Sequence, residues 1–311
     1  MAAATAALAI LGFGGTAAAA QQAAHCHFAS GSHALRISIA RDPKREGRSG
    51  SAYVGVRRRF VYVFAGEAGD RVPCTGASPT TLNIEAVFVD AAPRLRSVEL
   101  VVDQRGGVFA PGNTDEGDGS SEVEWDIDLG NRGLAYFLMT QGDDAVSALD
   151  LGDQTIADLN AFETHLDLDV SVRGAGLIVL GLGGNDLLSA VPPAPGPYDP
   201  YSSGPPTASF GIGLLGGAGA DGLFGSPAAD ALVGGGGADF VAAGDGNDAI
   251  GTSDMSADVI DCGAGQDRLT SDKRDRAHAC ERRGGSAAAA RATRLPPGVA
   301  PDQLPLRLRA R

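Results

Sequence analysis

The sequence has few aromatic residues, and after residue 24 it has no long apolar run. Aromatic side chains make up 5% of its 311 residues, whereas glycine occurs 45 times. An average globular domain has about 7% glycine and a fuller set of core aromatics, so this composition favours a fold built from repeated small turns. No segment after residue 24 holds the roughly 18 uncharged apolar residues that a membrane span needs, so no membrane span is predicted.

Common catalytic and zinc-binding motifs are also missing. The sequence contains neither H-E-x-x-H nor G-x-S-x-G, and no two of its four cysteines have C-x-x-C spacing. We therefore predict that the protein is not an enzyme, and we expect His165, which lies among alternating carboxylates, to decorate a strand. Aspartates on adjacent turns of a β-solenoid could still cleave a polysaccharide, as a lyase or hydrolase, and this alternative stays open.

Positive charge is absent where negative charge is dense. The net charge is −13, and residues 216–267 contain nine aspartates without a lysine or an arginine. The basic run Arg57–Arg59 is too short for a nucleic-acid footprint in such an acidic chain. No nucleic-acid partner is therefore expected.

The first 24 residues have the pattern of a signal peptide. They form a short apolar segment that ends in small residues, with a candidate cleavage position of the A-x-A type after Ala20 or after Ala24. We therefore predict a secreted protein, extracellular or associated with the cell wall.

The four cysteines lie in two pairs, one in each half of the chain. Export makes disulfides plausible, and four cysteines allow three pairings. Pairing by proximity, Cys26 with Cys74 and Cys262 with Cys280, is the favoured one. The alternative for Cys26 is a soft-metal site with its two flanking histidines.

The chain divides into segments where its pattern changes. Apolar and polar residues alternate in short runs from Leu35 to about Leu134, with Leu82 and Ile84 among them, which is typical of strands with one buried face. A proline-rich interruption cannot donate to a sheet ladder, and the basic tail lacks a period and aromatics. The predicted segments are the signal peptide 1–24, a β-rich region 25–138, a parallel β-solenoid 139–283 with a Pro-rich loop 191–206, and a disordered basic tail 284–311.

A nine-residue repeat begins at Gly216. An aspartate recurs every nine residues, with one extra residue before the fifth, and an aliphatic residue follows each aspartate by two positions. A fixed period of this kind indicates stacked units that bury their apolar residues only against their neighbours. The aspartates are Asp221, Asp230, Asp239, Asp248, Asp258 and Asp267, and the aliphatic residues are Leu223, Leu232, Val241, Ile250, Ile260 and Leu269.

The units follow the template G-G-x-G-x-D-x-U-x, where U is a large aliphatic residue. Gly216–Phe224 and Gly234–Ala242 match every fixed position. The array resembles the repeats-in-toxin, or hemolysin-type, calcium-binding family. The resemblance implies an all-β fold, a right-handed parallel β-solenoid with a C-terminal calcium β-roll, in which two units form one coil and calcium lies between turns.

Elementary chemistry agrees with calcium as the ligand. Glycine lets the backbone close around an ion, calcium takes six to eight oxygen ligands, and these turns lack the sulfur and imidazole that zinc prefers. With two units per coil, Asp221, Asp239 and Asp258 share one edge. A divalent cation would relieve the repulsion between their carboxylates. The candidate metal residues are Gly216, Gly217, Ala218, Gly219, Asp221, Asp230, Gly234, Gly235, Gly236, Gly237, Asp239, Gly244, Gly246, Asp248, Asp258, Gly263, Gly265, Asp267 and, in an isolated unit, Asp186.

Several alternatives concern the occupancy of these sites. The aspartates could cap turns through bonds to backbone groups without any ion. Ala228 and Ser256 replace the third fixed glycine of their units and Pro227 stiffens its turn, so the sites of those units are expected to be weak or empty. Asp144 lies in a second isolated unit with an open role. The predicted function is calcium-coupled folding of a structural or adhesive module, with an extracellular polysaccharide or protein as its partner.

Overall fold

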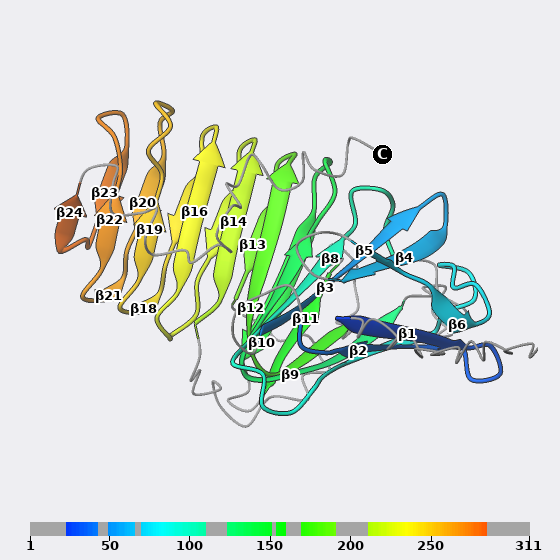
Figure 1. Cartoon of the computed structure of the whole chain (residues 1–311). Coiled ribbons are helices and arrows are strands. Elements are labelled where there is room, and N and C mark those ends of the chain that lie inside the picture. The colour runs from blue at the N-terminus through cyan, green and yellow to red at the C-terminus, as the bar shows by residue number, and fades with distance from the viewer. Residues whose placement is uncertain are drawn as a thin grey trace, which may run out of the picture.

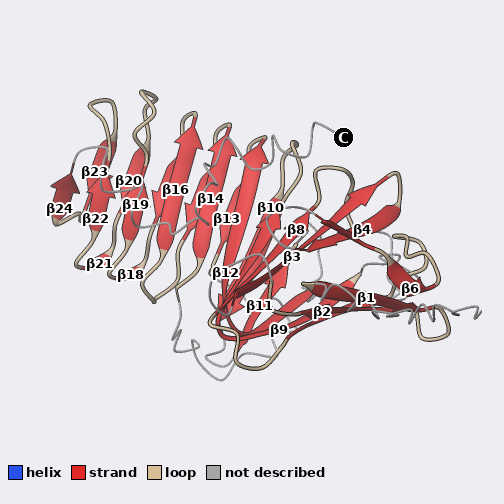
Figure 2. Ribbon diagram, in the orientation of Figure 1, coloured by secondary structure: helices blue, strands red, loops and turns tan. Residues whose placement is uncertain are grey.

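The computed structural model describes residues 23–42, 49–65, 70–109, 123–150, 154–159, 169–190 and 211–284. These residues form strands, turns and loops and no helix (Figure 2). The Pro-rich loop 191–206, His165, residues 1–22 of the signal peptide and residues 285–311 of the tail lie outside the described residues.

The strands are named in chain order. In the N-terminal part they are β1 (Ala24–Ala29), β2 (Ala34–Ile39), β3 (Ser49–Arg57), β4 (Phe60–Ala65), β5 (Asp70–Val72), β6 (Cys74–Gly76), β7 (Ala86–Ala91), β8 (Ser97–Asp103), β9 (Glu124–Leu138), β10 (Ala145–Asp150), β11 (Gln154–Asp158) and β12 (Val170–Gly183). In the C-terminal part they are β13 (Leu187–Ser189), β14 (Gly213–Ala218), β15 (Gly222–Phe224), β16 (Ala231–Gly236), β17 (Phe240–Ala242), β18 (Asp245–Gly246), β19 (Ala249–Gly251), β20 (Val259–Asp261), β21 (Ala264–Gly265), β22 (Arg268–Thr270), β23 (Arg276–His278) and β24 (Arg282–Gly284).

Three rows of parallel strands make up most of a large, open, mixed sheet. Row A pairs β3, β8, the second half of β9, the second half of β12, β14, β16, β19, β22 and β24 in that order. Row B pairs β10, β13, β15, β17, β20 and β23. Row C pairs β2, β7 and the first halves of β9 and β12. Row A therefore crosses the predicted boundary at residue 138 without a break.

Antiparallel strands occur only in the N-terminal part of the described chain. β1 pairs with β2, β3 with β4, and β4 with β5. β11 pairs with both β10 and β12 and so joins row B to row C. Figure 1 shows the regular stack from β12 to β24 at one end of the molecule and the diverging strands β1 to β8 at the other.

The core of the C-terminal part consists of the aliphatic residues of the repeat. In row A, Leu214, Leu232, Ile250 and Leu269 occupy successive register positions, and in row B, Leu188, Leu223, Val241 and Ile260 do so. All eight are essentially inaccessible to solvent. Burying one such side chain contributes roughly 1.5–3 kcal/mol, and here each contribution depends on the neighbouring coil.

The N-terminal core follows the predicted alternation with one exception. Leu35, Ile37 and Ile39 of β2 are buried while the residues between them are exposed. Residues 81–83 instead form a turn, in which Leu82 is exposed, and only Ile84 after it enters the core. The expectation of a strand there was wrong because Thr80, Thr81 and Asn83 close a turn, with the backbone N–H of Thr80 donating to the Asn83 side chain.

Two disulfides join the pairs of cysteines that are nearest in sequence, as predicted. Cys26 of β1 is bonded to Cys74 of β6, and Cys262 is bonded to Cys280. The described residues hold no free cysteine, so the disulfide replaces the soft-metal alternative at Cys26. The described part of the chain also offers no helix that could cross a membrane.

Candidate functional site

The repeated aspartates lie on two edges of the stack, each directly before a strand. We define the first edge as the carboxylates that precede the strands of row B: Asp144, Asp186, Asp221, Asp239, Asp258 and Asp275. We define the second edge as those that precede strands of row A: Asp230, Asp248, Asp267 and Glu281. Because strands within a row pair in register, these carboxylates stack from coil to coil.

A chain of hydrogen bonds connects the carboxylates of the first edge. The backbone N–H of Asp144 donates to Asp186 Oδ1 at 2.9 Å, and that of Asp186 donates to Asp221 Oδ1 at 2.8 Å. The same bond continues from Asp221 to Asp239, from Asp239 to Asp258 and from Asp258 to Asp275. Each carboxylate after Asp144 thus receives one N–H from the member of the edge before it.

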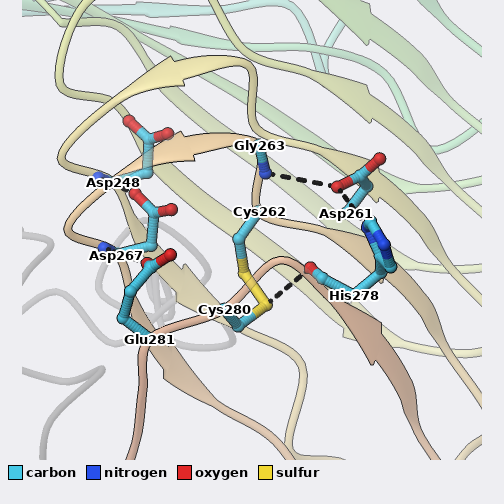
Figure 3. Close-up of a disulfide and its surroundings, with 8 residues drawn as sticks. All are labelled: Asp248, Asp261, Cys262, Gly263, Asp267, His278, Cys280 and Glu281. Atoms are coloured by element: carbon cyan, nitrogen blue, oxygen red, sulfur yellow. Dashed lines mark hydrogen bonds and ion pairs between the residues drawn. A yellow bond between two sulfur atoms is a disulfide. The ribbon is translucent and has the colours of Figure 1, made fainter.

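The second edge repeats this arrangement. The backbone N–H of Asp230 donates to Asp248 Oδ1 at 2.8 Å, and that of Asp248 donates to Asp267 Oδ1 at 2.9 Å. The N–H of Asp267 donates to Glu281 Oε2, which ends the edge. Figure 3 shows Asp248, Asp267 and Glu281 one above another beside the Cys262–Cys280 disulfide.

The second oxygen of most of these aspartates is buried without a hydrogen-bond partner. The side chains are at least 96% shielded from solvent, and an unpaired buried polar group costs about 1–3 kcal/mol, or more when it is charged. Such groups call for an explanation in a native structure, such as an ion. The unpaired atoms are the Oδ2 atoms of Asp186, Asp221, Asp239, Asp248, Asp258 and Asp267.

Burial raises the pKa values of these carboxyls. Removal from water is the largest cause, and neighbouring carboxylates raise the pKa further, while the N–H bond lowers it. The pKa rises to about 7 for Asp186, Asp248 and Asp258 and to about 6 for Asp239. The pKa of Asp221 is also raised. Near neutral pH, these carboxyls are therefore divided between protonated and charged forms, and the bonds that lower their pKa values come from backbone N–H groups.

The first glycine of a unit leaves space where an unpaired carboxylate oxygen and a carbonyl oxygen meet. A side chain on Gly216 would begin 2.3 Å from Asp221 Oδ2 and 2.6 Å from the Gly234 carbonyl oxygen. A side chain on Gly181 would begin 2.0 Å from Asp186 Oδ2 and 2.6 Å from the Gly216 carbonyl oxygen. A β-carbon at either position would fill this space, which explains the glycine there.

Carbonyl oxygens also stack at the second and fourth positions of the units. A side chain on Gly235 would begin 2.0 Å from the Gly217 carbonyl oxygen, and one on Gly237 would begin 1.6 Å from that of Gly219. Both Gly235 and Gly237 have left-handed backbones, which L side chains rarely adopt. The Gly219 N–H donates to the Gly236 carbonyl, so the turns are also joined by direct backbone bonds.

This donor set consists of oxygen alone. The described residues contain no group of three or more His, Cys, Asp or Glu side chains able to hold a metal ion. A cation on these edges would therefore need backbone carbonyls beside the carboxylates. Hard cations such as calcium accept this combination, with six to eight oxygens at about 2.3–2.6 Å.

The structure brings the sequence-predicted residues together in two groups. Asp221, Asp239 and Asp258 share the first edge, where Asp186 joins them, and the remaining three repeat aspartates share the second. The Ala218 carbonyl accepts the Gly184 N–H and so joins the isolated unit to the array. The repeat aspartates do cap backbone groups, as the ion-free alternative expects, but all except Asp230 do so with one oxygen only.

Some residues of the edges were not predicted. Asp275 and Glu281 end the first and second edges, but they lie outside the nine-residue period, so no spacing indicates their role. Thr140 and Ser226 contact Asp144 and Asp230 through hydroxyl and backbone groups. Their common signal is a hydroxyl residue four positions before the aspartate, where the template has glycine.

Comparison with known proteins does not assign the chain to a family. The chain matches no protein-family model, no curated protein and no solved structure.

Proposed function

We propose that the protein is a secreted calcium-binding module whose C-terminal part, a right-handed parallel β-solenoid of the repeats-in-toxin type, folds together with its ions. One observation supports this above all: six buried aspartate oxygens, stacked along two edges, lack any partner. Divalent cations between the turns would supply the missing interaction at every one of them.

The choice of calcium follows from the donors and their spacing. At Gly181 and at Gly216, the unpaired oxygen of Asp186 or Asp221 borders the same space as a glycine carbonyl of the adjacent turn. Calcium tolerates such irregular oxygen cages, whereas magnesium demands near-ideal octahedral geometry and gives up its waters reluctantly. Zinc would favour thiolate or imidazole ligands.

The solenoid part of the proposal is supported by the regular pairing of both rows. The N–H of Asp221 reaches Asp239 and that of Asp230 reaches Asp248, each 18 residues further along the chain. A coil is therefore 18 residues long, that is, two nine-residue units, one on each edge.

Ion binding would couple to folding in this arrangement. The oxygens of one site come from adjacent coils, so the site exists only when those coils are stacked. A ligand that binds only the folded state stabilises it by about 2.7 kcal/mol per site at 100 times its Kd. Several such sites would decide whether the C-terminal coils are ordered. Low calcium before export and high calcium outside would then set the two states.

Export is supported by the disulfides and by the position of β1. Disulfides form and persist in oxidising compartments. β1 begins at Ala24, which is fully buried and pairs with Ile39. Cleavage after Ala20 leaves this strand intact, so we propose that position for removal of the signal peptide. The external role is structural or adhesive, toward a polysaccharide or protein.

Calorimetry with calcium tests the proposal directly. The intact chain is expected to bind several calcium ions near pH 7.5, and the double substitution Asp221→Asn and Asp239→Asn is expected to bind fewer. Asp245→Asn provides the matched control, since Asp245 lies in the same array but is exposed. Absence of calcium binding by the intact chain at millimolar concentration would contradict the proposal. An assay for released reducing or unsaturated sugars tests the alternative enzyme function separately.

A further inference from the structure

Two aspartates of the edges differ from the six with unpaired oxygens. Both oxygens of Asp230 accept hydrogen bonds from the Ser226 hydroxyl, at 3.1 and 3.0 Å, and Oδ2 also accepts the Ser226 backbone N–H. Both oxygens of Asp144 accept hydrogen bonds from the Thr140 hydroxyl, at 3.0 Å each, and Oδ2 also accepts the Thr140 N–H. These two turns thus satisfy their carboxylates from within.

The two turns share a third bond and a distinct backbone. The Ser226 hydroxyl oxygen accepts the N–H of Ala228, and the Thr140 hydroxyl oxygen accepts the N–H of Gly142. In five other turns the residue four positions before the aspartate has a left-handed backbone, and each of these turns leaves Oδ2 unpaired: Leu182, Gly217, Gly235, Gly244 and Gly263. Ser226 and Thr140 are not among the described residues with positive φ, and their N–H groups point at the carboxylate.

The satisfied aspartates occupy equivalent places in the stack. Asp144 is the first member of the first edge, and Asp230 is the first member of the second edge, where its Oδ1 accepts the N–H of Ile212 rather than that of an aspartate. Both therefore lie where an edge begins, Asp144 directly before β10 and Asp230 directly before β16. Within each edge, the unpaired oxygens all belong to members that follow this first one.

We infer that the hydroxyls of Thr140 and Ser226 take the place of a cation in the first turn of each edge, so that these two turns bind no ion. This inference rests on the proposed calcium function and adds which turns are ion-free. A calcium ion would sit about 2.3–2.6 Å from the carboxylate oxygens. The hydroxyl oxygen of Ser226, 3.0 Å from Asp230 Oδ2, already occupies that approach, and Ser226 is itself buried.

A direction of folding follows from this placement. The first turn of each edge closes without an ion and provides an N–H for the carboxylate of the next member. Calcium-dependent order then extends from Asp186 and Asp248 toward the C-terminal end. A chelated protein is expected to keep these first turns and to lose the later ones.

Removing the hydroxyl from one of these two turns provides the test. In Ser226→Gly the hydroxyl is gone and the backbone gains the freedom of the other turns, so calorimetry is expected to show one more bound calcium ion than in the wild type. Ser226→Ala serves as the matched control, because it removes the hydroxyl but retains a side chain. It is expected to lower the melting temperature by the same amount in chelator and in calcium, and to bind no additional calcium ion. Thr140→Gly repeats the test on the first edge.

The outcomes separate the two proposals. If the wild type binds calcium but Ser226→Gly and Thr140→Gly both bind the same number of ions, the inference is overturned and the proposed function stands. If the wild type binds none, the proposed function itself fails. Anomalous scattering from wild-type crystals grown in calcium gives an answer that needs no variant. Ion density is expected at Asp186, Asp221, Asp239 and the later turns, and density between Asp230 and Ser226 would refute the inference.

Discussion

The N-terminal and C-terminal parts compensate a buried aspartate in opposite ways. Asp103, at the end of β8, is bonded to the Arg105 guanidinium and to the Tyr53 hydroxyl. Removal from water acts to raise its pKa, but the bonds from Arg105 and Tyr53 bring the pKa below its usual value. Asp248 in the C-terminal stack is also buried, has no cation nearby in sequence, and its pKa is raised to about 7.

The two parts also fill their cores differently. Trp125 stacks edge-to-face with Phe109 and Phe137, at 4.9 and 6.0 Å between ring centres, and such pairs add about 0.5–1.5 kcal/mol beyond area burial. The coils after Gly213 contribute one aliphatic side chain per nine residues instead. The N-terminal part thus pairs its buried charge internally and has a large core. The order of the C-terminal part depends on packing between adjacent strands of each row and, in our proposal, on cations from the solution.

Chelation is expected to have the largest effect on this contrast. Removing calcium should increase hydrogen exchange strongly over β13, residues 213–224 and residues 231–284, and leave strands of the N-terminal part, such as β2 and β8, protected. The reason is that, among the described residues, the six unpaired Oδ2 atoms lie on the two edges, whereas Asp126 of β9 is ion-paired with Arg173. Hydrogen-exchange mass spectrometry in chelator, in calcium and in magnesium of equal ionic strength measures it. Equal exchange of both parts would remove the distinction.

The next largest effect is expected from pH in the absence of calcium. The folded-state pKa values of Asp186, Asp248 and Asp258 are about 7, above an unfolded value near 3.8. The folded state therefore binds more protons between these values, and the chelated protein is expected to lose stability as pH rises from about 4 to about 7. Calcium affinity should increase over the same range, because ions and protons compete. Thermal unfolding in chelator at several pH values measures the trend, and a rise in stability with pH would contradict it.

The C-terminal disulfide is expected to have an intermediate effect. Cys262–Cys280 closes a short loop that contains β21, β22 and β23, and a loop of this size is worth about 3 kcal/mol in the chain-entropy model. Replacing both cysteines with alanine should lower the free energy of unfolding by that amount in calcium. Urea unfolding measures the change, with replacement of Cys26 and Cys74 as the comparison in the N-terminal part.

Single carboxylate substitutions are expected to have the smallest effects, with opposite signs in the two parts. Asp103→Asn should destabilise the protein by about 2 kcal/mol with or without calcium, because it weakens hydrogen bonds to a charged group. Asp248→Asn keeps an oxygen for the Asp230 N–H but removes a repelling charge. It should therefore stabilise the chelated protein and reduce the number of bound calcium ions. Destabilisation in chelator by Asp248→Asn would show that repulsion along the edge is unimportant.

The repeat could be predicted from sequence because the same residue types recur at the same positions of each nine-residue unit. A fixed interval places Asp221 above Asp239 and Leu223 beside Val241 once the chain coils, without knowledge of distant contacts. The N-terminal part has no such interval. Its alternation predicted strands, but not that β2 pairs with β7 rather than with β3, since pairing there depends on residues far apart in sequence.

Residues that interrupt the period could not be assigned from the sequence. Ser226 looked like one of several departures from the template, and only the backbone conformation of its turn shows that it bonds Asp230. Asp275 acts as the last member of the first edge although it lies in a charged run between the last repeat and Cys280. Departures from a repeat carry information that spacing alone does not contain.

The continuity of row A has a mechanical consequence. Each coil after β12 is held by the coil before it and the coil after it, so tension applied at the C-terminal end would load one rung at a time. The chain would lengthen in steps of about one 18-residue coil. When the tension falls, it would refold onto the last coil that is still paired. In the calcium-bound state that we propose, the resistance of this stack to stretching would depend on the surrounding calcium concentration.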